Sequence, residues 1–161
     1  MRRYIVTLSL FLAVGSMVFA QDLARLKADT EKFIGTWKYE STDYSITFIL
    51  TRGYMGQIEL IHGRYKVQKD GQLYESKNVP APSFFALTLP DGSPNDLFSA
   101  FIDNVYHRST RFSLTMENKR SRTLVFTIIS ESERDALLPE GEIRKEGTLL
   151  PPSGTVFTKQ R

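Results

Sequence analysis

The sequence predicts an all-β fold, a small antiparallel β-barrel that follows a short N-terminal helix. Most of the chain after residue 35 consists of short runs in which apolar and polar side chains alternate, and many of the apolar residues are β-branched or aromatic. Alternation with a period of two is typical of strands. The roughly seven to nine runs are joined by hairpin-length links without β-α-β spacing, so we expect an antiparallel sandwich or an up-and-down barrel.

The N-terminus predicts a secretory signal peptide over residues 1–20. Two arginines precede the apolar run "YIVTLSLFLAVGSMVF", and Val18 and Ala20 occupy the positions that a signal peptidase reads. A transmembrane helix is the alternative, but it needs about 20 apolar residues in succession, and polar residues and a glycine interrupt this run. We therefore expect an exported protein, periplasmic or secreted, with a single domain over residues 21–161 and no stable membrane insertion.

The charge of the mature chain gives no reason to expect a nucleic-acid partner. The whole sequence has 21 Lys and Arg against 18 Asp and Glu, and two of the arginines lie in the signal peptide, which leaves 19 basic against 18 acidic residues. Nucleic-acid-binding domains have a larger basic excess. The sequence has no cysteine, so disulfides are excluded and stability must come from packing.

Residues 22–33 predict a short amphipathic helix, with Asp22 as its cap and apolar side chains at Leu23, Leu26 and Phe33. Everything after this segment changes to the strand period. The Asp-Gly pair in "KDGQ" predicts a tight hairpin. The predicted strand runs are, in order, residues 36–41, 44–51, 57–68, 73–76, 111–116, 122–129 and 154–161.

The middle of the chain carries less regular signals. In residues 57–68 the apolar side chains change parity around Gly63, which predicts a β-bulge there. Residues 77–97 are broken by prolines and contain one apolar island, residues 84–89. Residues 93–104 combine a serine cap, a first-turn proline and apolar residues on one helical side. We expect a short helix there, with the end of a strand as the alternative.

The stretch "FIGTWKY" resembles the first-strand motif of lipocalins and fatty-acid-binding proteins. In that superfamily a short helix leads into Gly-x-Trp, and the tryptophan closes one end of the barrel against an Arg or Lys of the last strand. The resemblance implies a calycin-like, lipocalin-like barrel with Gly35 and Trp37 as the motif. Lys159 or Arg161 then supplies the cation, and we assign Arg161. A cation over such a ring adds about 0.5–2 kcal/mol.

Two departures limit this resemblance. The link "STD" between the first two predicted strands has no room for the helical lid of fatty-acid-binding proteins, and the chain lacks the disulfides usual in lipocalins. Nearly the whole mature chain also resembles a family of small exported bacterial β-proteins of unknown function, through the fragments "GTWKY", "SITFIL", "YKVQKDGQLYES", "RFSLTMEN", "LVFTI" and "LPPSGTVFTKQ". That resemblance implies export and a compact β fold, and it brings no assigned activity.

Strand parity places five aromatic residues on the inner side of the predicted barrel: Tyr39, Phe48, Tyr65, Phe112 and Phe126. If the interior is open, these residues contact a small apolar ligand and the protein is a non-enzymatic, lipocalin-like binding protein. The alternative is a structural or protein-interaction domain, because small barrels are often filled by their own side chains. The expected partner is a small apolar ligand or an extracytoplasmic protein or glycan, and no cofactor is expected.

The other candidate groups favour surface roles over catalysis. His62 and His107 lack metal-ligand spacing, so no metal site is expected. The carboxylates between residues 131 and 146 have the chemistry of glycoside hydrolysis, but we expect a solvated loop. The basic runs "HRSTR" and "NKRSR" flank one predicted strand at opposite ends, which disfavours a continuous nucleic-acid track. Of Phe84 and Phe85, we expect one to pack inward and the other to face a barrel mouth or a partner.

Overall fold

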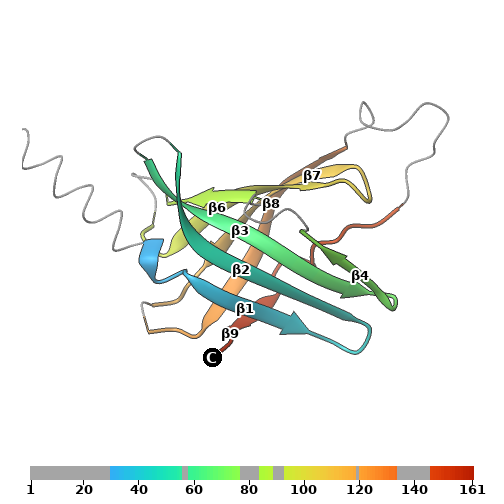
Figure 1. Ribbon diagram of the computed structural model, residues 1–161, viewed down its shortest axis with the longest axis horizontal. Coiled ribbons are helices and arrows are strands. Elements are labelled where there is room, and N and C mark those ends of the chain that lie inside the picture. The colour runs from blue at the N-terminus through green and yellow to red at the C-terminus, as the bar shows by residue number, and fades with distance from the viewer. Residues whose placement is uncertain (1–29, 56–57, 77–83, 89–92, 119, 134–145) are drawn as a thin grey trace, which may run out of the picture.

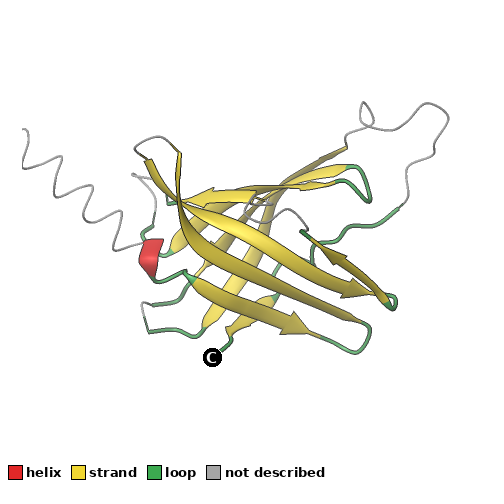
Figure 2. Cartoon of the chain, viewed as in Figure 1, coloured by secondary structure: helices red, strands yellow, loops and turns green. Residues whose placement is uncertain are grey.

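The computed structural model describes residues 30–55, 58–76, 84–88, 93–118, 120–133 and 146–161, and nearly all regular structure in them is β-strand (Figures 1 and 2). The predicted all-β class is confirmed. The predicted helix over residues 22–33 lies mostly outside the described residues, among which Thr30 and Glu31 are helical. The strands are β1 (Gly35–Glu40), β2 (Tyr44–Met55), β3 (Ile58–Lys69), β4 (Gln72–Glu75), β5 (Phe84–Leu87), β6 (Asp96–Asp103), β7 (Arg108–Thr115), β8 (Thr123–Glu133) and β9 (Val156–Lys159).

Eight of these strands close into an antiparallel barrel. They follow the order β2-β1-β9-β8-β7-β6-β5-β3, and a further pairing between β2 and β3 completes the ring. The extra strand, β4, pairs with the last residues of β3, on the edge whose earlier residues pair with β5. Of the two architectures that the link lengths allowed, the structure is therefore the barrel and not the sandwich.

The hairpin between β3 and β4 turns at the Asp-Gly pair that predicted it. Asp70 and Gly71 both have positive φ, at 52° and 75°. Two successive residues with positive φ are the geometry of a type I′ turn, whose twist matches that of the flanking strands. The link between β1 and β2 is one residue longer, and it is closed by a 2.8 Å hydrogen bond from the backbone N–H of Ser41 to the backbone oxygen of Tyr44.

The predicted bulge at Gly63 is wrong. β2 and β3 pair over their whole length without a shift in register. The change of parity in the sequence arises because Leu60 and Ile61 are both buried, Leu60 on the outer face and Ile61 in the core. Gly63 instead makes room for a neighbour, since a Cβ atom there would lie 2.0 Å from Cε2 of Phe84.

The predicted helix over residues 93–104 is also wrong, and the segment forms a complete strand where the alternative was the end of one. Residues 96–103 form β6, which pairs with β7 along its entire length. Leu97 and Phe101 both face the core, whereas Phe98 and Ile102 face outward. Positions four residues apart share a face in a helix and in a strand alike, so the apolar spacing alone did not separate the two.

Buried side chains from all eight barrel strands form one core cluster inside the ring. Phe33, which precedes β1, and Leu149 and Leu150, which precede β9, belong to the same cluster. The largest of its fully buried members are Trp37, Phe33, Phe48, Phe101, Phe112, Phe126 and Phe157. A core built from so many aromatic rings buries a large apolar area in a chain that has no disulfide.

Candidate functional site

Trp37 lies at the end of the barrel where β1 begins, which we call the Trp37 end. Its side chain is fully buried, and Nε1 donates a 2.8 Å hydrogen bond to the backbone oxygen of Phe33. From the same segment, Lys32 Nζ donates a 2.7 Å hydrogen bond to Asn95 Oδ1. Asn95 precedes β6, which lies across the ring from β1. The segment before β1 therefore crosses this end of the barrel and is fixed on the far side.

Gly35 and Lys159 complete the packing around Trp37. Lys159 Nζ lies 5.1 Å from the centre of the Trp37 ring, within cation–π distance. Gly35 has a φ of 139°, and a Cβ atom there would lie 2.7 Å from Cε of Lys159. The glycine thus supplies a backbone conformation that other residues rarely adopt and the space through which the lysine reaches the ring. Of the two cations considered from the sequence, Lys159 takes this position, and Arg161 is exposed.

Aromatic rings fill the middle of the barrel. Phe48 of β2 stacks on Phe112 of β7 with a distance of 6.1 Å between ring centres. Along the ring of strands, β2 and β7 are separated by three strands in either direction, so these two rings come from opposite walls. Phe48 also contacts Phe157 of β9 at 4.9 Å and Phe84 of β5 at 5.4 Å, and Phe112 contacts Phe126 of β8 at 5.2 Å.

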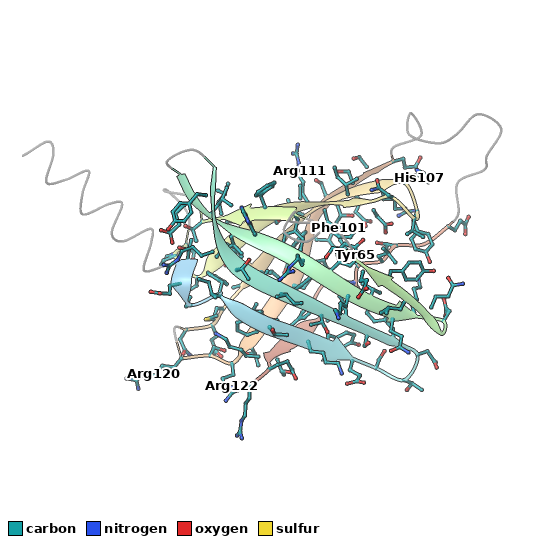
Figure 3. All side chains as sticks on the ribbon, viewed as in Figure 1. Tyr65, Phe101, His107, Arg111, Arg120 and Arg122 are labelled. Atoms are coloured by element: carbon teal, nitrogen blue, oxygen red, sulfur yellow. The ribbon has the colours of Figure 1, made fainter. Side chains whose placement is uncertain are left out.

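The five residues predicted to face inward are not equivalent. Phe48, Phe112 and Phe126 are fully buried and contact one another through Phe112. Tyr39 and Tyr65 are partly buried and pack against the edge of this core. Both tyrosines contact other aromatic rings, Tyr65 with Phe101 at 5.0 Å, and Tyr39 with Phe157 at 6.3 Å and with Tyr44 at 6.2 Å between ring centres. Figure 3 shows Tyr65 and Phe101 turned toward each other from β3 and β6.

The opposite end of the barrel is organised by a buried carboxylate, and we call it the Asp103 end. Asp103, the last residue of β6, is 1% exposed. Its Oδ1 accepts hydrogen bonds of 3.0 Å from the backbone N–H groups of Val105 and Tyr106. Its Oδ2 accepts one of 2.7 Å from the backbone N–H of Leu149. Both oxygens are thus occupied by backbone donors, as a buried carboxylate requires.

Residues 148–151, which we call the strap, cross the Asp103 end. Besides the bond from Leu149 to Asp103, the strap accepts hydrogen bonds from two strands that lie apart from β6 in the ring. Tyr44 Oη donates to the Leu149 oxygen at 2.8 Å, and Lys69 Nζ donates to the Thr148 oxygen at 3.1 Å. Leu149 and Leu150 are buried beneath these bonds. The strap therefore joins the ends of β2, β3 and β6 and closes the barrel there.

Two tyrosines near the strap titrate abnormally. Burial raises the pKa of Tyr44 well above its usual value, and the neighbouring Tyr39 and the Asp103 carboxylate add to the effect. Burial also raises the pKa of Tyr65, with a further contribution from Asp103. Both phenols stay neutral near pH 7, and the Tyr44 hydroxyl keeps the proton that it donates to the strap.

The carboxylates and histidines examined as catalytic or metal-binding candidates lie apart. Glu131 and Glu133 belong to β8, so the prediction that they lie in a loop is wrong, whereas Asp135, Glu140 and Glu142 lie outside the described residues. His62 packs edge-on against Phe85, with 5.0 Å between ring centres. Within the described ranges, no three His, Asp or Glu side chains are grouped so that they could hold a metal ion.

Phe84 and Phe85 divide between the inside and the outside of the barrel, as predicted. Phe84 is 3% exposed and belongs to the core, whereas Phe85 is 48% exposed on the outer face of β5. The basic runs lie near opposite ends of β7, as expected, but residues 108–111 of the first run belong to the strand and do not flank it. Figure 3 shows Arg111 on one side of the barrel and Arg120 and Arg122 on the other.

Sequence reasoning missed Asp103 and the strap. Asp103 falls at an inward position of β6, two residues after Phe101, and a charged residue on the apolar parity of a strand is a signal of a buried, hydrogen-bonded group. Leu149 and Leu150 stand directly before two prolines in a polar stretch. An isolated apolar pair of that kind indicates that a loop packs on a core.

A protein-family model matches residues 1–83, and its description is a family of unknown function (DUF6705). No curated protein and no solved structure matches the chain. In the part of the chain that the structure describes, no helix is long and apolar enough to span a bilayer.

Proposed function

The chain belongs to this family of unknown function, and from that premise we propose that it is a non-enzymatic, exported interaction domain whose barrel is filled by its own side chains. It acts through its outer surface on an extracytoplasmic partner. Its interior is a structural core that carries no ligand. Of the two functions inferred from the sequence, the packing supports the filled domain over the binding protein with an open, lipocalin-like interior.

The observation that carries this proposal is the contact between Phe48 and Phe112. Their rings stack at 6.1 Å although they belong to opposite walls of the barrel. Ring centres at that distance are in direct contact, so a ligand has no room between them. The Phe84 ring packs against the same pair, with its centre 5.6 Å from that of Phe112.

The two ends of the barrel support the same proposal. A lipocalin-like binding protein needs one open mouth through which its ligand enters the barrel. Here Trp37 and the segment before β1 cover one end, and the strap with Leu149 covers the other. In this proposal the barrel resembles calycins through Gly35, Trp37 and Lys159. These residues close one end of the barrel and form no ligand site.

Export is part of the proposal and follows from the first 20 residues. Two arginines, an apolar run of signal-peptide length and residues suited to signal peptidase direct the chain out of the cytoplasm, to the periplasm or the medium. A domain without cysteine that is stabilised by a packed aromatic core suits such a compartment, because neither oxidation nor reduction of disulfides affects it.

An apolar fluorescent probe such as N-phenyl-1-naphthylamine tests the filled interior. We expect no saturable binding to the wild-type protein, and binding of about one probe per molecule to Phe112→Ala, which opens a cavity beside Phe48, Phe84 and Phe126. Phe85→Ala is the matched control, since it removes the same side chain from the outer face. Stoichiometric binding to the wild type that persists in Phe85→Ala would contradict the proposal.

A further inference from the structure

The outer wall formed by β3, β5, β6 and β7 carries several apolar side chains that are exposed to solvent. Phe85 and Leu87 of β5 are 48% and 41% exposed, and Ile102 of β6 is 46% exposed. Phe98 of β6, which is partly buried, pairs with Leu87 and extends the same surface. These four residues and the outward side chains between them form what we call the β5 face. Exposed apolar residues that adjoin one another mark interaction sites more often than scattered ones do.

Basic side chains flank the β5 face on both sides. Arg64 lies on β3, two positions from His62, whose register partner is Phe85. Arg111 lies on β7 and pairs with Ala100 of β6. Among the described residues, neither arginine forms an ion pair. Figure 3 shows Arg111 extending away from the barrel on this side.

Acidic residues are scarce on the same wall. The outward positions of β3 and β7 carry His62, Arg64, Lys66 and Arg111, and Lys66 is already paired with Glu75 of β4 at 3.6 Å. Asp96, at the start of β6, is the one carboxylate among the described outward positions of β3, β5, β6 and β7. The face therefore combines apolar side chains with uncompensated positive charge.

We propose that the β5 face is a docking surface for an anionic lipid bilayer. Apolar side chains that lie between arginines suit the membrane interface. The apolar side chains enter the region between the headgroups and the acyl chains, while the arginines bind the lipid phosphates. The outer wall of a closed barrel is convex, so this strip meets a flat bilayer along its length. The protein adsorbs to the surface and does not insert. This inference rests on the proposed function, since it names the partner of an outer surface.

Co-sedimentation of the exported full-length domain with lipid vesicles tests the docking surface. We expect binding to vesicles that contain equal amounts of phosphatidylglycerol and phosphatidylcholine. Binding to vesicles of phosphatidylcholine alone should be at least about tenfold weaker. Arg64→Gln with Arg111→Gln should weaken binding about fivefold per arginine. Phe85→Ser with Ile102→Ser should weaken it about tenfold or more.

Two double variants are matched controls, and all variants must keep the melting temperature of the wild type. Arg120→Gln with Arg122→Gln removes the same charge from exposed residues beyond the far end of β7. Val125→Ser with Val156→Ser removes apolar surface from residues that are 38% and 47% exposed on β8 and β9. Both controls should bind vesicles as the wild type does.

The proposal is overturned if the wild type stays in the supernatant with anionic vesicles, or if either control loses as much binding as its counterpart on the β5 face. Retention on immobilised polyglutamate without binding to vesicles indicates an acidic protein partner and also overturns it. None of these results would contradict the proposal of a filled barrel, because the interior is tested by probe binding and not by vesicle binding.

Discussion

Gly35 illustrates how a single position is determined by its neighbours. Its φ of 139° favours glycine, and the space beside it is taken by the Lys159 side chain on its way to Trp37. The Gly-x-Trp motif in the sequence thus supplies two of the three residues, Gly35, Trp37 and Lys159, that pack together at one end of the barrel. The resemblance identified Gly35 and Trp37 correctly as neighbours of a cation, but sequence spacing did not distinguish Lys159 from Arg161. The register of the strands distinguishes them, because β9 pairs Lys159 directly with Trp37.

Trp37→Ala tests whether this arrangement is structural. The ring is fully buried, so its removal leaves a large cavity, and we expect the free energy of unfolding to fall by about 3–5 kcal/mol. Urea titration followed by circular dichroism measures the change. Tyr54→Ala is the control, since that side chain is 59% exposed and should cost under about 0.5 kcal/mol. A loss below about 1 kcal/mol for Trp37→Ala would assign Trp37 to a surface role.

The two tyrosines near the strap predict a loss of stability in alkali. Their pKa values are raised on folding, so the folded state keeps protons that the unfolded state releases above about pH 10. The contribution is complete below that pH and is lost as the pH rises further. We expect the free energy of unfolding to be level from about pH 7 to 9 and to fall steeply from about pH 10.

Tyr44→Phe separates this effect from general alkaline denaturation. It removes the raised ionisation and the hydrogen bond to Leu149, so stability at pH 7 should drop by about 1 kcal/mol while the alkaline slope becomes shallower. Tyr54→Phe, at an exposed position, should leave the slope as it is. Urea titrations at a series of pH values give both quantities. An unchanged slope in Tyr44→Phe would show that Tyr44 ionises normally.

At the scale of elements, the strands were predictable wherever one face of a run was apolar and the other polar. β1, β2 and β8 follow that rule, and their positions agree with the predicted runs. The rule failed where both faces of a strand are apolar. β3 and β6 each bury one face in the core and also carry apolar residues at outward positions, and this produced the wrong bulge at Gly63 and the wrong helix over residues 93–104. Both errors lie on the β5 face or beside it.

The strap was not predictable because its partners are far away in sequence. Leu149 reaches Tyr44 and Asp103, which are separated from it by 105 and 46 residues. Periodicity reports on local structure and carries no information about contacts at that separation. The candidate interior was predicted well by comparison, because strand parity alone placed Phe48, Phe112 and Phe126 in the core. Whether they surround a space or fill it depends on ring positions that parity does not specify.

Asp103→Ala tests the strap as an element. The substitution leaves three backbone N–H groups without their acceptor, and we expect a loss of about 2 kcal/mol or more in the free energy of unfolding. Hydrogen exchange of the Leu149 amide should become faster than that of the Phe48 amide in the barrel wall. Asp96→Ala, which removes a partly buried carboxylate at the other end of β6, is the control. Unchanged protection of Leu149 would contradict the role given to Asp103.

At the scale of the whole molecule, the barrel is closed in three ways. The pairing of β2 with β3 completes the ring of strands, the segment before β1 covers the Trp37 end, and the strap covers the Asp103 end. Aromatic rings from opposite walls then meet in the middle. A closed barrel has few free strand edges, which protects the protein against edge-to-edge aggregation. What we propose such a molecule offers to a partner is its outer surface, where the β5 face exposes Phe85, Leu87 and Ile102.

Native mass spectrometry of the protein purified from its own host, followed by organic extraction, tests the filled barrel most directly. We predict the mass of the bare polypeptide and an extract without a stoichiometric small molecule, because Phe48 and Phe112 leave no room for one. A small apolar molecule recovered at about one per protein would contradict the account. It would show that the rings separate to admit a ligand and that the protein is a lipocalin-like carrier.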